Sequence, residues 1–365
     1  LLTFENYTYE RPDFEQEKAK FAKLLDAFTN ASSVEEQNDA IEEINKFRNH
    51  ISTLFNLVYV RASIDTNDEY YQKERDYWDE ISPEVQKLNT DFYKELVKTP
   101  FREDLEKKWG SQLFEIADYS IKGFAPEVIE LLQKENKLTS EYSKLVASAE
   151  VEFNGETYTL AQLGPFLQDK DRDVRKKAAS ASSGFFEANA EKFDDIYDQL
   201  VKVRHEIATT LGYKNFVELG YVRMMRIDYN AEMVANYRKQ VQEYIVPLVS
   251  KLYKKQAERI GIDSLKFYDE NFQYKTGNAT PKGSPEWIIE NGKKMYEELS
   301  PETNEFFNFM IERNLMDLVA KKGKESGGYC TFIEDYQSPF IFSNFNGTSG
   351  DIDVLTHEAG HAFQV

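Results

Sequence analysis

Hydrophobic positions recur at helical spacing over most of the chain. Between Ile196 and Leu211, apolar residues return every three or four positions, and Glu, Lys and Asp occupy many of the positions between them. This is the pattern of an amphipathic helix. Comparable patterns predict helices over residues 14–28, 34–63, 67–98, 126–134, 171–189 and 233–260. We therefore expect a mainly α fold with a large helical body.

Two segments depart from the helical period and predict a small β element. Around Asn154-Gly155, the dipeptide favoured in tight hairpin turns, apolar residues alternate with polar ones, which predicts a hairpin near 150–160. From Gly327 to Gly347 the chain is rich in aromatic residues and contains Phe340-Ile341-Phe342. This second segment predicts extended strands near 329–346.

Gly123 and Pro126 interrupt the helical pattern and mark a joint. We predict an N-terminal helical lobe over residues 1–122 and a helical body over 123–365 that leads into a helix at the C-terminal end of the sequence. No fixed-period repeat occurs, although the succession of long helices leaves a solenoid as an alternative.

Charge and composition exclude several function classes. The chain has 64 acidic and 45 basic residues, a net charge of -19, which would repel nucleic acid and anionic membrane surfaces. A single cysteine, Cys330, excludes an internal disulfide. No secretion signal begins the sequence and no apolar run approaches the roughly 18 residues of a membrane span. We expect a soluble, cytoplasmic protein.

The last residues carry the chemistry. Two of the four histidines lie four residues apart in His357-Glu358-Ala359-Gly360-His361. On a helix, with about 100° per residue, the two imidazoles lie one turn and about 40° apart, so both can bind one zinc ion. Glu358 can approach a catalytic water as a general base without binding the metal. This spacing indicates zinc-dependent hydrolysis of amide bonds.

The surrounding residues favour this interpretation. The apolar residues of the segment gather on the side opposite the histidines and can anchor the helix: Ile352, Leu355, Ala359, Ala362 and Phe363. Thr348 with Asp351 predicts a capping box and a helix that begins at about Ser349.

A second His-Glu pair serves as an internal comparison. His205-Glu206 is followed by Thr209 where a second histidine would be needed. We expect this pair to lie on a solvated helix surface.

At the C-terminal end, the sequence resembles a known family. Residues 326–330, 339–346 and 351–364 resemble the oligoendopeptidase F and Pz-peptidase branch of the thimet oligopeptidase family, and residues 171–178, 211–213 and 226–229 resemble its helical framework. The resemblance implies a helical body with a deep channel that admits short peptides. It also implies one zinc ion per active site, bound by His357 and His361, with Glu358 as base.

The resemblance further implies residues that contact the substrate. The segment from Phe342 through Phe345 to Asn346 resembles an edge strand that holds the peptide backbone, and Gly328 and Tyr329 resemble a neighbouring substrate loop.

One departure from the family concerns the zinc site. The family's third zinc ligand is a glutamate on the helix after the motif, whereas this sequence ends at Val365. We expect the 365 residues to be a fragment that the C-terminal remainder of the same protein completes, or the remainder to be supplied by another chain. An upstream acidic residue is the alternative third ligand.

Two other functions stay open from the sequence. A zinc carboxypeptidase or aminopeptidase could share the same helix, and it would require a free peptide terminus where an endopeptidase cuts a blocked peptide. A non-catalytic helical binding protein would suit the first three hundred residues, and zinc content would distinguish it.

Overall fold

A computed structural model describes residues 1–365 and confirms a mainly α fold with small sheets. Its helices are α1 (Phe14–Thr29), α2 (Val34–Ile64), α3 (Glu69–Leu96), α4 (Arg102–Trp109), α5 (Gln112–Lys122), α6 (Ile129–Ala147), α7 (Arg172–Ala188), α8 (Ala190–Thr210), α9 (Phe216–Arg223), α10 (Ala231–Gln240), α11 (Val246–Ile260), α12 (Pro285–Leu299), α13 (Pro301–Glu312) and α14 (Gly350–Gln364). Its strands are β1 (Val151–Phe153), β2 (Glu156–Tyr158), β3 (Met316–Val319), β4 (Tyr329–Ile333) and β5 (Ser338–Phe345). None of the helices is both long and apolar enough to cross a membrane.

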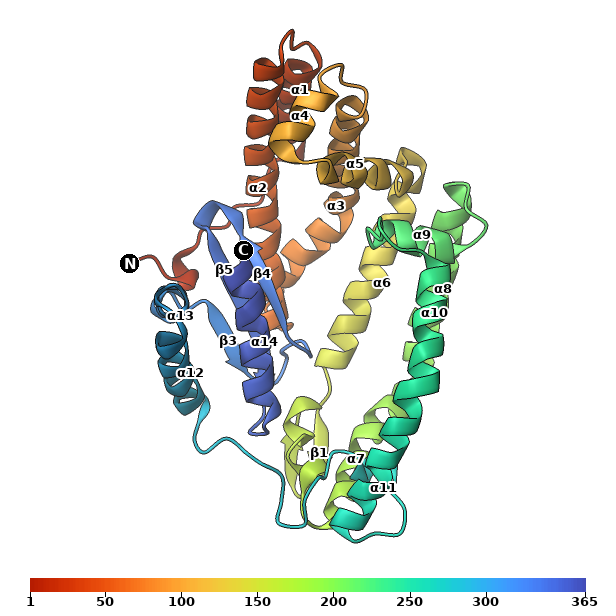
Figure 1. The fold of residues 1–365 in the computed structure, drawn as a ribbon, viewed down its shortest axis with the longest axis vertical. Coiled ribbons are helices and arrows are strands. Elements are labelled where there is room, and N and C mark those ends of the chain that lie inside the picture. The colour runs from red at the N-terminus through yellow and green to blue at the C-terminus, as the bar shows by residue number, and fades with distance from the viewer.

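The long helices α2 and α3 begin at side-chain caps. The Ser33 hydroxyl accepts the amide of Glu36, and the Asp68 carboxylate accepts those of Tyr70 and Tyr71. These caps satisfy amides that have no partner within the helix. One end of both helices packs with α1, α4 and α5 around a buried aromatic and aliphatic core (Figure 1).

The other end of α2 reaches a three-stranded sheet of order β3-β5-β4. β5 lies in the centre, parallel to β3 and antiparallel to β4. The sheet packs between α2 and α14, so that one core joins residues from all three layers (Figure 1): Leu57 and Val60 of α2, Phe340 and Phe342 of β5, and Leu355 and Ala359 of α14. This core contains residues from both the predicted N-terminal lobe (1–122) and the predicted helical body (123–365). The lobe boundary itself stays a prediction.

Most predicted elements occur, with changed bounds. The hairpin is confirmed, and Asn154 and Gly155 adopt the positive φ values of 50° and 84° that its tight turn requires. The predicted helix 126–134 continues as α6 to Ala147, and the predicted helix 233–260 contains a π-helical turn at Val241–Ile245. The sequence patterns did not predict α4, α5, α9, α12, α13 or β3.

Candidate active site

α14 follows directly from β5, and a buried carboxylate fixes the turn between them. Asp351, 5% exposed, accepts the amides of Asn346 at 2.9 Å and Gly347 at 2.8 Å. Burial raises the pKa of Asp351, and these two hydrogen bonds oppose that rise. The predicted capping box is wrong, because the Thr348 hydroxyl donates to the Asn346 side chain and Ser349 is the N-cap. Asp351 thus stabilises the turn before the helix.

The apolar face of α14 is narrower than predicted. Leu355, Ala359 and Ala362 are buried against the sheet, whereas Ile352 and Phe363 are 39% and 47% exposed. Phe363 still contacts Phe306 of α13, with ring centroids 5.4 Å apart. Leu355, Ala359 and Ala362, at positions i, i+4 and i+7, therefore form the face that anchors α14 to the sheet.

His357 and His361 lie on the exposed side of α14, where their imidazoles converge. Their Nε2 atoms are 3.2 Å apart, and neither ring has another hydrogen-bond partner in the chain. Two nitrogens bound to one tetrahedral zinc at about 2.0–2.1 Å would be separated by about 3.3 Å. The donor pair therefore fits one zinc ion.

The remaining histidines do not contribute to this pair. His205 lies exposed on α8, as expected of a solvated helix surface, and His50 of α2 pairs with Asp335 at 2.6 Å. No cluster of three or more His, Cys, Asp or Glu residues that could hold a metal occurs within residues 1–365. The chain thus offers two recognisable ligands at this site.

Glu358 lies on a different side of α14 from the histidines and is 8% exposed. Its carboxylate faces the start of β4: a Cβ atom built on Gly328 would lie 3.9 Å from Oε1 of Glu358. No protein group donates a hydrogen bond to this carboxylate. Burial, and secondarily the charge of Glu358, raises the pKa of the neighbouring Cys330 thiol to about 11. Cys330 is thereby held as a thiol.

The predicted edge position of the Phe342–Asn346 segment is wrong. β5 pairs with β3 on one side and β4 on the other, so its backbone groups are already used. Phe345 is 3% exposed within the core, and Asn346 donates its side-chain amide to the Ala161 carbonyl. Both residues have structural partners in this fold.

β4 is the edge strand nearest Glu358. Gly328 is exposed directly before it, while Tyr329 turns its ring toward α2 and stacks on Phe342 at 4.7 Å. The Tyr329 hydroxyl bonds with the Ser63 hydroxyl at 2.7 Å. Gly328 and Tyr329 thus lie beside the site, with Gly328 facing Glu358 and Tyr329 facing away from it.

The alternation of the β4 backbone shows which groups face outward. Ile341 of β5 donates its amide toward β3, to Leu315, and the Phe332 carbonyl of β4 accepts the Asn56 side chain of α2. In an antiparallel ladder, alternate residues point away from the partner strand. The backbone amide and carbonyl of Cys330 therefore point away from β5, as the carbonyl of Phe332 does. Gly328, two residues before Cys330, has the same direction. The Phe332 carbonyl is paired with Asn56, whereas the outward backbone groups of Gly328 and Cys330 form an unpaired edge next to Glu358.

Sequence reasoning missed α2 as part of this region. Asn56, Tyr59 and Ser63 lie on α2, and all three contact β4 or its side chains. They are about 270 residues from β4 in the sequence, so no local spacing relates them to it. Phe55 and Tyr59, two aromatic residues one helical turn apart, were the only feature of the sequence that marked this part of α2.

Comparisons with known proteins agree with the geometry. A family model described as Peptidase M3 N-terminal domain matches residues 4–124, and one described as Peptidase family M3 matches residues 166–365. A search among curated proteins gave no match.

Solved structures give the same family. The chain is 62% identical to a structure titled PZ peptidase A with inhibitor 2, with a TM-score of 0.98 over 99% of this chain and 64% of that one. It is 57% identical to a structure from Bacillus anthracis strain Ames named for oligoendopeptidase F, with a TM-score of 0.98 over 100% of this chain and 67% of that one. The chain thus spans about two thirds of the length of these relatives.

Proposed function

This chain belongs to peptidase family M3, and we propose that the protein is a zinc oligoendopeptidase that hydrolyses internal bonds of short, unstructured peptides. The observation that carries the proposal is the convergence of two exposed imidazoles, 3.2 Å apart, on a helix that also presents the buried carboxylate of Glu358. The names of the similar structures, PZ peptidase and oligoendopeptidase F, support the same substrate class.

Each residue of the motif has a separate task in the proposed reaction. His357 and His361 hold the zinc ion, which when bound polarises the scissile carbonyl and acidifies the attacking water. Glu358 accepts the proton of that water and passes it to the nitrogen of the departing amine. Its carboxylate suits this task because no protein donor occupies it. Its burial also limits the solvent that competes for the proton.

The substrate backbone is proposed to lie along β4. The outward amides and carbonyls of Gly328 and Cys330 can pair with an extended peptide, as in other cases of strand addition. Gly328 supports this role because a side chain there would crowd Val354 at 3.2 Å and the Phe342 carbonyl at 3.3 Å. A peptide bound in this way passes next to Glu358. A deep channel around it, which admits short peptides and excludes folded proteins, is part of the proposal.

The test uses the full-length protein and a fluorogenic peptide of about ten residues that is acetylated at its N-terminus and amidated at its C-terminus. We expect zinc-dependent cleavage at an internal bond, located by mass spectrometry of the products. Removal of zinc with a chelator should abolish cleavage, and added zinc should restore it.

The same substrate separates the alternatives. Cleavage only after one terminus is unblocked would identify an exopeptidase and contradict the endopeptidase. Peptide binding without any cleavage, in protein that retains zinc, would identify a non-catalytic binding protein.

A further inference from the structure

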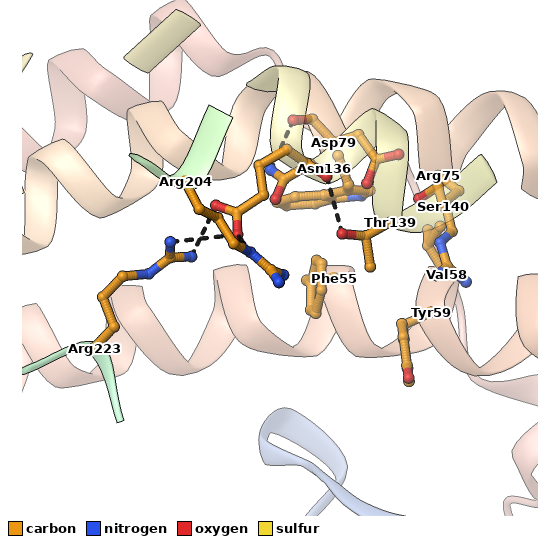
Figure 2. Close-up of a pocket in the computed structure, with 12 residues that line it drawn as sticks. Phe55, Val58, Tyr59, Arg75, Asp79, Asn136, Thr139, Ser140, Arg204 and Arg223 are labelled. Carbon is orange, nitrogen blue, oxygen red and sulfur yellow. Dashed lines mark hydrogen bonds and ion pairs between the residues drawn. The ribbon is translucent and has the colours of Figure 1, made fainter. Parts of the chain in front are cut away.

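A cavity of about 270 Å³ lies between α2, α3, α6, α8 and α9, outside the zinc-binding helix (Figure 2). Phe55 and Tyr59 of α2 line it together with the buried Trp78 of α3. At one end, Arg204 of α8 and Arg223 of α9 enter it, as Figure 2 shows. The cavity therefore combines an aromatic wall with two guanidinium groups.

The two arginines share one carboxylate. Glu135 of α6, 4% exposed, accepts Nε of Arg204 at 2.7 Å, and its second oxygen lies 2.9 Å from Nη2 of Arg223. One negative charge against two positive charges leaves a net positive charge at this end. The two terminal nitrogens of Arg204 have no acceptor in the chain, and the side chains of Arg204 and Arg223 are 39% and 30% exposed. A guanidinium in this state is a ready donor to a carboxylate.

The cavity has two further charged groups. Arg75 is paired with Glu325 at 2.7 Å and lies over the Tyr59 ring, 5.0 Å from its centroid. Asp79 of α3 has one carboxylate oxygen that is buried without a donor, and burial raises the pKa of this group. The two guanidinium groups at the Glu135 end are therefore the ones that share a single carboxylate.

The cavity is connected with the proposed active site through aromatic contacts. The Tyr59 ring lies 5.2 Å from the ring of Tyr329, which follows Gly328, the residue that faces Glu358. The cavity and the start of β4 thus share the contact between Tyr59 and Tyr329, and the proposal places the peptide residues beyond β4 toward this cavity.

We propose that this cavity is a specificity subsite in which Arg204 and Arg223 bind a carboxylate of the peptide, either an acidic side chain or the C-terminal carboxylate. The aromatic wall of Phe55, Tyr59 and Trp78 packs against the apolar part of the same residue. This inference rests on the proposed peptidase function, because the ligand is the peptide substrate.

The test is a double-mutant cycle in the full-length protein, in which an arginine and a peptide carboxylate are removed separately and together. The peptides share one sequence and carry either a free or an amidated C-terminus, and either Glu or Gln within the chain. In the parent protein, we expect removal of the bound carboxylate to raise KM about 10- to 100-fold, as for a charge-assisted hydrogen bond. The peptide that shows this loss identifies the source of the carboxylate.

The arginine variants test whether the peptide carboxylate binds in this cavity. In Arg204→Gln or Arg223→Gln, the difference between the two peptides should shrink to less than about threefold, whereas Arg204→Lys should retain part of it. Arg11→Gln is the matched control, because Arg11 is also a half-exposed arginine paired with a buried carboxylate, Glu74, at 2.7 Å. It should leave the difference between the peptides unchanged.

Two outcomes would overturn the proposal. One is a parent protein with the same KM for all four peptides, and the other is an undiminished carboxylate effect in both arginine variants. Peptide binding to the Glu358→Gln variant, measured by fluorescence anisotropy, separates this proposal from the catalytic one. Carboxylate-dependent binding to this variant, together with a parent protein that does not hydrolyse peptides, would contradict only the peptidase function. Hydrolysis by the parent without carboxylate dependence would contradict only the subsite.

Discussion

Glu358 is 8% exposed, and no protein group donates a hydrogen bond to its carboxylate. Other buried carboxylates of this chain have such donors: Asp351, Glu135 and Asp269 all accept hydrogen bonds from amides or arginines. An unpaired carboxylate at Glu358 is what the proposed general base requires, because the attacking water would be the donor to it.

We expect Glu358→Gln to lower peptide turnover by about 10²- to 10⁴-fold while zinc remains bound. The amide has nearly the same shape as the carboxylate but cannot take up the proton, and Glu358 is not a ligand in the proposed site. Turnover of the blocked peptide and zinc content by atomic absorption would be measured on the same preparation. Turnover close to that of the parent would rule out the role of base.

His361→Ala and His357→Ala should each lose stoichiometric zinc and activity, since each removes one of only two imidazoles that converge at 3.2 Å. His205→Ala is the matched control, because His205 also precedes a glutamate on a helix but is exposed on α8, where it has no such partner. It should keep full zinc content. Retention of one zinc per chain in the His361 or His357 variant would contradict the ligand assignment.

Among the elements, α7 is fixed by a buried ion cluster. Asp269, 0% exposed, accepts Nη2 of Arg172 at 2.7 Å and Nη2 of Arg175 at 2.8 Å. Burial alone would raise the pKa of Asp269, but hydrogen bonds from Arg172, the Lys266 amide and Arg175 outweigh burial and lower it. The cluster joins α7 to the loop before α12.

We expect Asp269→Asn to lower the free energy of unfolding by about 3–5 kcal/mol at pH 7, because it leaves the buried Arg175 without its charged partner. The pKa of Asp269 is lower in the folded state than the value of about 3.9 for unfolded aspartate. Its contribution is therefore complete above that value and is lost as the pH falls through the folded pKa. Urea unfolding of parent and variant at pH 7 and near pH 3 would measure this.

The control for this prediction is Asp198→Asn, since Asp198 forms an exposed pair with Lys202 and should change stability little. A difference between parent and Asp269→Asn that grows as the pH falls would contradict the assigned sign.

At the scale of the whole molecule, the site depends on the meeting of three layers: α2, the sheet and α14. The apolar residues of α14 contact β5. Gly328, directly before β4, lies next to Glu358, and β4 itself is covered by α2. The histidines face away from these layers. The fold therefore fixes Glu358 against a strand edge and leaves His357 and His361 open to further groups.

We expect residues 1–365 by themselves to bind zinc more than about 100-fold more weakly than the longer proteins of the family, and to hydrolyse peptides negligibly. A catalytic zinc site normally has three protein ligands, and no third His, Cys, Asp or Glu lies beside His357 and His361. Competition with a chromophoric chelator would measure the affinity. Tight, stoichiometric zinc together with turnover in the 365-residue chain would show that an upstream carboxylate moves in as third ligand.

The sequence by itself determined the elements with strong local signals. Long periodic stretches identified α1, α2, α3, α7 and α8, because an amphipathic helix repeats its pattern over many turns. Asn154-Gly155 identified the hairpin, because few other residues accept its positive φ values. The spacing of His357 and His361 predicted their convergence, since one turn of helix fixes it without help from the rest of the chain.

Only the tertiary structure decided which strand has a free edge and what surrounds the base. The sequence predicts β5 as an extended segment, but its central position depends on β3, which pairs with it on the side opposite β4 and joins Met316 to Ile341. The burial of Glu358 depends on the approach of β4, and the cavity with Arg204 and Arg223 depends on five helices that meet in space. Residue spacing encodes neighbours along one element, whereas these features arise from contacts between segments up to about 300 residues apart, which packing of the whole core selects.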